Sequence, residues 1–228
     1  MNEIINPENN KEELVTEQLE QPEWIKKGYP SEELMNWFEN ENDYHLLRNF
    51  DLNENSLVVD IGCYNGTWLK DMYCKYRCNC IGVEPITKYY ELSNRILTDI
   101  NKVKLYNYGL FVESHIKKTQ MNMAGDASRL DESHNPISVE MQYAKDFFDS
   151  IKTNIDVLQI NIEGYEYQLI PFMIKNGLLS NVKNLQIQFH NFYDNSEKQM
   201  NRIITKLETI GFKTKFNYPF IWYGAVKQ

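Results

Sequence analysis

Residues 57–68, Leu-Val-Val-Asp-Ile-Gly-Cys-Tyr-Asn-Gly-Thr-Trp, predict a buried strand, a glycine turn and the start of a helix. The apolar run reaches the carboxylate of Asp60 and then turns through Gly62 and Gly66. Glycines at such a turn let a ligand approach the backbone, and the helix that follows offers free N–H groups. Open α/β sheets build nucleotide-sized sites in this way, at the carboxyl ends of their strands.

The spacing of the glycines distinguishes two classes of nucleotide ligand. A dinucleotide-binding turn needs G-x-G-x-x-G, so that a pyrophosphate can sit on the helix N-terminus. Here the pattern is D-x-G-x-x-x-G, with the bulky Cys63 and Tyr64 inside the turn. Asp60 would repel a phosphate but attract an ammonium group, which S-adenosylmethionine (SAM) carries. The pattern therefore favours SAM over NAD.

A second acidic strand end follows at residues 80–85, Cys-Ile-Gly-Val-Glu-Pro. Glu84 lies 22 residues beyond Gly62 (84 − 62), close to the offset of about 20 at which an acidic group meets ribose hydroxyls in doubly wound folds. Glu84 could equally complement the dipole of the helix that Pro85 opens. Both roles are compatible with one carboxylate.

The net charge of −8 is concentrated at the N-terminus. Residues 1–43 hold 12 acidic and 3 basic side chains, whereas the remainder holds 20 acidic and 21 basic ones. The acidity therefore belongs to an arm, and the body of the protein is nearly neutral. Neither part offers the basic face that nucleic-acid binding requires, so we expect no nucleic-acid partner.

Three segments are expected along the chain. Residues 1–30 form an acidic, partly disordered arm, 31–54 a helical extension, and 55–228 the main domain. No segment approaches the roughly 20 apolar residues that span a bilayer, and none suits a signal peptide. The four cysteines lack the spacing of a zinc site, so we expect reduced thiols, no metal and a cytoplasmic location. The oligomeric state is not predicted.

Helical and strand patterns alternate through the main domain. Helices are expected at 31–50 (one or two), 67–76, 86–99, 143–151, 165–176 with an interruption at Pro171, and 200–210 before Gly211. Strands are expected at 57–61, 80–84, 102–110, 155–162, 182–190, 212–217 and 220–226. This order predicts an α/β three-layer sandwich with a mostly parallel seven-stranded sheet and an antiparallel C-terminal edge hairpin.

Two further expectations concern the flanking segments. In the N-terminal helical extension we expect Ser31 as a helix cap and burial of Leu34, Trp37, Phe38, Leu47 and Phe50. Residues 111–142 are polar and are expected to contain a small hairpin. They form either a substrate-facing insertion, which we favour, or a plain surface excursion.

A third group of polar residues follows two later strands. The apolar strand at 155–162 brings Asn161 and Glu163 to the edge that carries Asp60 and Glu84, and the next strand ends at His190. A carboxylate or imidazole there could take a proton from a hydroxyl that attacks a methyl sulfonium. Alternatively, Glu163 caps a helix and His190 is an ordinary strand-end residue.

These residues together resemble the FkbM family of SAM-dependent methyltransferases, which have a Rossmann-like fold. The resemblance covers about residue 55 to the C-terminus and implies an O-methyltransferase acting on a hydroxyl, often of a sugar, glycan or natural product. The family's Asp-x-Gly-x-x-x-Gly turn, Glu-Pro and post-third-strand segments imply these cofactor-binding residues: Asp60, Gly62, Tyr64, Asn65, Gly66, Glu84 and Asn107. Its Lys-x-Asp-x-Glu-Gly-x-Glu signature, similar to residues 159–166, implies catalytic roles near Asn161 and Glu163, with His190 beside them.

The chain departs from the family at three positions. Gln159 replaces a lysine, Asn161 an aspartate and Gln188 a common glutamate. Because a divalent cation prefers carboxylates, the losses disfavour a metal. Two other functions stay open: a nucleotide-dependent oxidoreductase, which the bulky Tyr64 disfavours, and a non-catalytic protein that kept the SAM fold.

Overall fold

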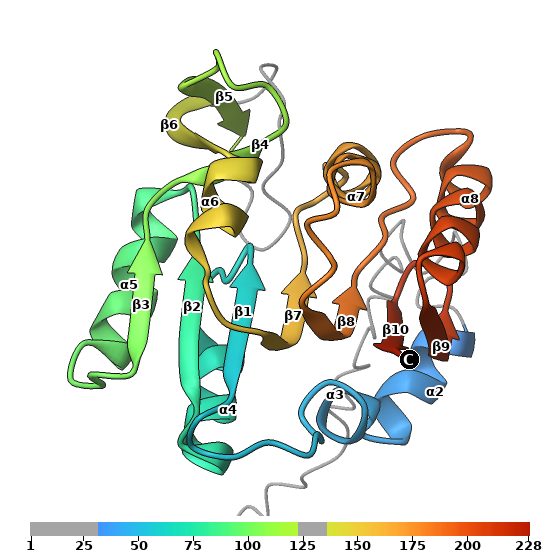
Figure 1. Ribbon diagram of the computed structural model, residues 1–228, viewed down its shortest axis with the longest axis horizontal. Helices are drawn as coiled ribbons and strands as arrows, with labels where there is room; N and C mark the ends of the chain where they lie inside the picture. Colours follow the sequence, from blue (N-terminus) through green and yellow to red (C-terminus); the bar gives the residue numbers. More distant parts are fainter. Residues whose placement is uncertain (1–31, 123–135) are drawn as a thin grey trace, which may run out of the picture.

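The computed structural model describes residues 32–122 and 136–228 (Figure 1). The expected acidic arm at 1–30, the Ser31 cap and residues 123–135 of the 111–142 insertion lie outside the described residues.

A seven-stranded sheet forms the centre of the molecule, with the strand order β3-β2-β1-β7-β8-β10-β9. The strands are β1 (Leu57–Ile61), β2 (Asn79–Val83), β3 (Val103–Tyr106), β7 (Ile155–Ile160), β8 (Val182–Ile187), β9 (Phe212–Tyr218) and β10 (Trp222–Lys227). β1, β2, β3, β7 and β8 are parallel, whereas β10 runs antiparallel to both β8 and β9. The predicted mostly parallel sheet with an antiparallel C-terminal hairpin is confirmed.

Helices cover both faces of this sheet, because successive side chains of its buried strands point to opposite sides. On one face Val58 packs with Trp68 and Leu69 of α4 (Thr67–Tyr76) and with Leu97 of α5 (Thr87–Leu97). On the other face Val59 belongs to the larger core. This core includes side chains of α6 (Ala144–Ser150), α7 (Glu166–Lys175) and α8 (Ser196–Thr209). The result is the three-layer α/β architecture.

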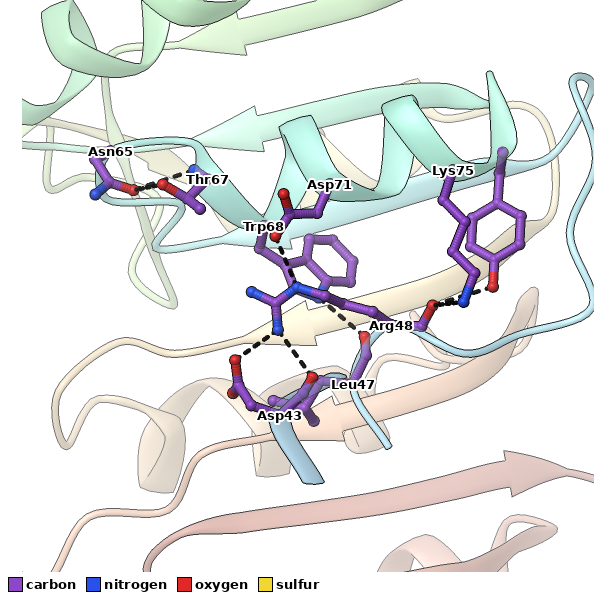
Figure 2. Close-up of polar contacts among 9 residues, drawn as sticks. Asp43, Leu47, Arg48, Asn65, Thr67, Trp68, Asp71 and Lys75 are labelled. Atoms are coloured by element: carbon purple, nitrogen blue, oxygen red, sulfur yellow. Dashed lines mark hydrogen bonds and ion pairs between the residues drawn. The ribbon is translucent and has the colours of Figure 1, made fainter. Parts of the chain in front are cut away.

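The N-terminal extension packs at the amino ends of the central strands (Figure 1). It contains α2 (Glu32–Glu39) and α3 (Asn42–His45), and its Trp37 and Leu47 are buried with Ile221. Figure 2 shows Arg48 between Asp43 and Asp71, with Nη1 2.6 Å from the Asp43 carboxylate and Nε 2.9 Å from that of Asp71. These ion pairs connect the extension to α4.

Two expectations about helices are wrong. Phe38 is 61% exposed, because the short helix α2 buries only a narrow stripe around Trp37. Pro171 does not interrupt α7, which runs continuously from Glu166 to Lys175. Leu169, Ile170 and Met173 are buried around the proline, and we attribute the continuity of the helix to this packing, which offsets the missing N–H bond. Among the described helices, none has the length and apolar character needed to cross a membrane.

The expected strand at 102–110 is also wrong, because it divides between two sheets. β3 pairs with β2, whereas β4 (Gly109–Phe111) joins β6 (Pro136–Tyr143) and β5 (Lys118–Asn122) in a second sheet of order β4-β6-β5. Gly109 permits the close pairing, since a Cβ there would lie 2.9 Å from Sδ of Met141. β5 and β6 are antiparallel, which confirms the small hairpin in the insertion. This sheet lies above the carboxyl ends of the central strands (Figure 1).

Candidate active site at the carboxyl edge of the sheet

The glycine turn after β1 is held against two neighbouring strands. The backbone N–H groups of Gly62 and Cys63 both donate to the carbonyl of Val83, at 2.9 and 3.1 Å. Gly62 has a φ of +85°, and a Cβ on it would lie 1.8 Å from the carbonyl oxygen of Asn161. The turn passes so close to the end of β7 that only glycine fits at position 62. The sequence pattern alone does not reveal this reason for the glycine.

The start of α4 depends on Gly66 and Asn65. Gly66 has a φ of +75°, and its missing Cβ leaves room for Ser93 and Leu97 of α5. The side-chain oxygen of Asn65 accepts hydrogen bonds from the backbone N–H and the hydroxyl of Thr67, at 3.1 and 2.7 Å (Figure 2). Both residues shape the turn, and neither lines the cleft described below.

Glu84 fixes the turn after β2 and faces the same space. Its two carboxylate oxygens accept hydrogen bonds from the N–H groups of Tyr64 and Ile86, at 2.9 and 2.8 Å. Burial raises the pKa of Glu84 to about 7 against the lowering effect of these bonds, and the charge of Asp60 adds to the rise. Asn107 supports the turn from β3, since its amide donates to the carbonyls of Glu84 and Pro85.

Asp60 lies beneath the turn and is only 2% exposed. Its carboxylate accepts a hydrogen bond of 3.3 Å from the side-chain amide of Gln159 on the adjacent strand β7. Burial raises the pKa of Asp60 to about 7, although the Gln159 bond and the charge of Arg48 lower it. Asp60 does not line the cleft, so any effect on a ligand there acts through its charge.

A cleft of about 130 Å³ opens between these strand ends. A smaller apolar cavity of about 40 Å³ adjoins it and shares Gly62, Pro85, Met121 and Ile162. The side-chain oxygen of Asn161, which also lines the cleft, is buried and has no hydrogen-bond partner among the described residues. The cleft lining comprises Gly62, Tyr64, Glu84, Pro85, Ile86, Tyr89, Met121, Asn161, Ile162 and Glu163.

The far end of the cleft carries a carboxylate–imidazole–carboxylate cluster. His190 follows β8, and its Nε2 lies 3.2 Å from Oε1 of Glu163. Its Nδ1 lies 3.1 Å from Oε1 of Glu166, which also accepts a hydrogen bond from the backbone N–H of His190. Glu166 is completely buried, and its second oxygen accepts the N–H of Gly164 at 2.8 Å. Glu166 thus holds both the imidazole and the turn that presents Glu163.

The two carboxylates determine the charge of His190. Burial alone would lower the pKa of His190, but the hydrogen bonds and negative charges of Glu163 and Glu166 outweigh it and raise the pKa to about 9. The imidazole is therefore protonated at neutral pH and does not act as a base there. Glu163, which lines the cleft, is the member of the cluster that can receive a proton from a ligand.

The structure brings five of the predicted site residues around the cleft: Gly62, Tyr64, Glu84, Asn161 and Glu163. The other five support the cleft from outside: Asp60, Asn65, Gly66, Asn107 and His190. Tyr89 also lines the cleft and was not predicted from the sequence; the centroid of its ring lies 4.6 Å from that of Tyr64. Its place in the first turn of the helix after Glu84-Pro85 is the signal that could have identified it.

A wider cavity of about 760 Å³ lies near the opposite edge of the sheet, around Arg48 and Lys75. Arg48 is paired with Asp43 and Asp71, and Lys75 donates to the carbonyl of Arg48 (Figure 2). These ion pairs and this hydrogen bond attach the N-terminal extension to α4. The strand-end cleft, with its unpartnered Asn161 oxygen and raised carboxylate pKa values, is the stronger candidate for chemistry.

Comparisons with known proteins identify the family of the chain. Residues 60–214 match the family described as the methyltransferase FkbM domain. No curated protein matches the sequence.

Solved structures share the fold at low sequence identity. A Streptococcus mutans protein assigned as a methyltransferase, in complex with S-adenosylhomocysteine (SAH), is 13% identical with a TM-score of 0.53. A Clostridium thermocellum protein assigned as an rRNA methylase is 14% identical with a TM-score of 0.52. Each alignment covers 84% of this chain and 97% of the other. At these identities the similarity establishes the Rossmann-like methyltransferase fold.

Proposed function

Because the chain belongs to the FkbM-domain family of SAM-dependent methyltransferases, we propose that it methylates a hydroxyl oxygen of a sugar, glycan or related natural product. The observation that carries the proposal is the Glu163 carboxylate, which lines the cleft and is held by a protonated His190. A carboxylate in this position can bind a hydroxyl and accept its proton.

The residues of the cleft fit SAM in their chemistry. SAM presents hydrogen-bond donors in its ribose hydroxyls and its ammonium group, and the cleft presents acceptors in Glu84 and in the unpartnered oxygen of Asn161. The adjoining cavity of about 40 Å³ is lined by apolar side chains, Met121 and Met141 among them, which would offer apolar contacts to the edge of the adenine base. A dinucleotide fits poorly, because the buried carboxylates of Asp60 and Glu84 would oppose its phosphates.

When bound, SAM supplies a methyl group already activated on a sulfonium. The protein then needs to place the acceptor hydroxyl and to remove one proton. Glu163 would accept a hydrogen bond from the hydroxyl and would receive its proton when the methyl group passes from sulfur to oxygen, with the S–CH3 bond broken and SAH as the leaving group. The oxygen becomes strongly acidic during that step, so a carboxylate can take its proton. His190 keeps the Glu163 carboxylate oriented through their 3.2 Å contact.

The carboxylates and the cysteines bear on the class of acceptor and on the compartment in which the reaction would occur. The carboxylates beside the cleft oppose a polyanion, so the proposed acceptor is not a nucleic acid. Cys63, Cys74, Cys78 and Cys80 are free thiols, which fits a reducing, cytoplasmic location.

The test is transfer of a labelled methyl group from SAM to a panel of glycosides by wild-type protein and Glu163→Gln. We expect kcat/KM to fall at least about 100-fold in the variant, with the Kd for SAM within about two-fold of wild type. Glu140→Gln is the matched control, since Glu140 is an exposed carboxylate of β6 paired with Lys118. Undiminished transfer by Glu163→Gln would refute the role of Glu163. SAM binding without transfer to any acceptor would favour the non-catalytic alternative.

A further inference from the structure

Two exposed aromatic side chains lie beside the Glu163–His190 pair. Phe192 and Tyr193 belong to the segment between β8 and α8, and their side chains are 38% and 51% exposed. Large apolar side chains of this kind at the rim of a polar site commonly take part in recognition. Neither residue lines the cleft itself, so the proposed methyl-transfer chemistry does not use them.

Contacts with the site hold both rings in place. A Cβ on Gly164 would lie 3.1 Å from Cδ2 of Phe192 and 3.3 Å from the hydroxyl of Tyr193. The ring of Phe192 stacks on the His190 imidazole, with centroids 5.0 Å apart and an interplanar angle of 28°. The ring of Tyr193 meets that of Tyr167 edge-on at 6.1 Å. The two aromatic residues are therefore neighbours of the Glu163 turn.

The surrounding charges restrict what can lie against these rings. Glu163 and Glu166 are carboxylates, and the one cation in direct contact with them among the described residues, His190, is already shared between them. An anionic ligand would meet this negative charge, and in the part of the chain that the structure describes no second cation contacts the two carboxylates to offset it. An uncharged ring can cover the aromatic side chains with its apolar face, and a hydroxyl on the ring can reach a carboxylate acceptor.

We propose that Phe192 and Tyr193 form the acceptor subsite, where an uncharged, hydroxylated ring lies against their side chains and directs one hydroxyl to Glu163. This inference rests on the proposed function and adds to it the two residues that select the shape of the acceptor. The aromatic pair provides the ring-binding surface, and Glu163 provides the polar contact.

Saturation-transfer NMR on the full chain, loaded with SAH, tests the subsite without requiring turnover. The probes are methyl α-D-glucopyranoside and phenol as saturated and planar uncharged rings, glycerol as a polyol without a ring, and glucose 6-phosphate as an anionic ring. The variants are Phe192→Leu, which keeps an apolar cover over His190, and Tyr193→Leu. Phe38→Ala removes an exposed aromatic ring from α2, 61% exposed and remote from the site, and is the control.

We expect at least one uncharged ring to bind with a Kd of about 1–10 mM and to bind at least about five-fold more weakly to each site variant. Binding to Phe38→Ala should equal that of wild type. The inference is overturned if neither uncharged ring binds, if glycerol or glucose 6-phosphate binds as well as the rings, or if both site variants bind like wild type. Ring binding without methyl transfer would refute the proposed function alone, whereas transfer to ring-free acceptors would refute the subsite alone.

Discussion

The completely buried carboxylate of Glu166 lies 3.1 Å from Nδ1 of His190 and leaves the opposite ring nitrogen facing Glu163. The same carboxylate accepts the N–H of Gly164, where φ is +99°. Glu166 therefore acts as a positioning residue. It holds the left-handed Glu163–Gly164 turn in place, and it stabilises the positive charge of the imidazole. The cluster is arranged so that one member, Glu163, lines the cleft.

The Glu166→Gln variant tests this arrangement through the titration of His190. The amide removes one of the two negative charges that raise the pKa of His190 to about 9, so we expect the pKa to fall. The stabilisation that His190 protonation provides is fully present below its ordinary pKa of 6.5 and is lost as the pH rises through about 9. Wild type should lose stability across this range, and Glu166→Gln should lose less.

NMR titration of the His190 ring resonances measures the pKa directly, and chemical denaturation at several pH values measures the stability. The exposed His45 provides an internal reference in both proteins. An unchanged His190 titration in Glu166→Gln would show that Glu166 does not set the charge of the imidazole.

Asp60→Asn should separate stability from ligand binding. The raised pKa of Asp60 means that its protonated form stabilises the fold below pH 3.8, and that this stabilisation is lost as the pH rises through about 7. A neutral asparagine avoids that loss, so we expect the variant to be more stable than wild type at pH 8 by on the order of 1 kcal/mol. We expect SAM to bind at least about ten-fold more weakly, because the negative charge beneath the glycine turn is gone.

Denaturation curves between pH 4 and 8, together with calorimetric SAM titration, check both parts of the Asp60 prediction. Asp149→Asn is the control, since Asp149 is an exposed carboxylate on α6 paired with Lys145. Equal pH dependence of stability in wild type and Asp60→Asn would contradict the account of the buried carboxylate.

Much of the site was predictable because it depends on local pattern. Apolar runs that end in Asp60, Glu84 and Asn161 identify strands, and parallel strands bring their carboxyl ends to one edge. The separation of β3 from β4 was not predictable, because apolar and polar positions continue to alternate across the break at 107–108. The His190–Glu166 contact joins residues 24 positions apart, so it depends on the packing of β8 against α7.

The orientation of the Asp60 side chain was likewise not predictable from the sequence. Its position before the glycine turn correctly placed it at the end of β1, but side-chain alternation and burial turned the carboxylate toward Gln159 and away from the cleft. Phe192 and Tyr193 likewise follow His190 in sequence with no pattern that separates them from ordinary core aromatics. Their exposure appears only in the folded protein.

Gly164→Ala should change the geometry of the Glu163–His190–Glu166 cluster more than it changes the overall fold. A Cβ at this φ of +99° is strained and would crowd Phe192 at 3.1 Å. Gly211→Ala is a matched control, since Gly211 has a φ of +92° and its nearest neighbour, Cε of Lys227, would lie 3.7 Å away. We expect both variants to lose about 1–2 kcal/mol of stability, and only Gly164→Ala to lower the pKa of His190. An unaltered His190 titration in Gly164→Ala would argue against a rigid Glu163–Gly164 turn.

The central claim, that the glycine-turn cleft binds SAM, is tested most directly by calorimetric titration of SAM into wild type and Glu84→Gln. Glu84 lines the cleft and is the acceptor assigned to the ribose hydroxyls. We predict a Kd on the order of 10 μM for wild type and binding at least about ten-fold weaker for a folded Glu84→Gln. No SAM binding by wild type, or equal affinity in the two proteins, would contradict the claim.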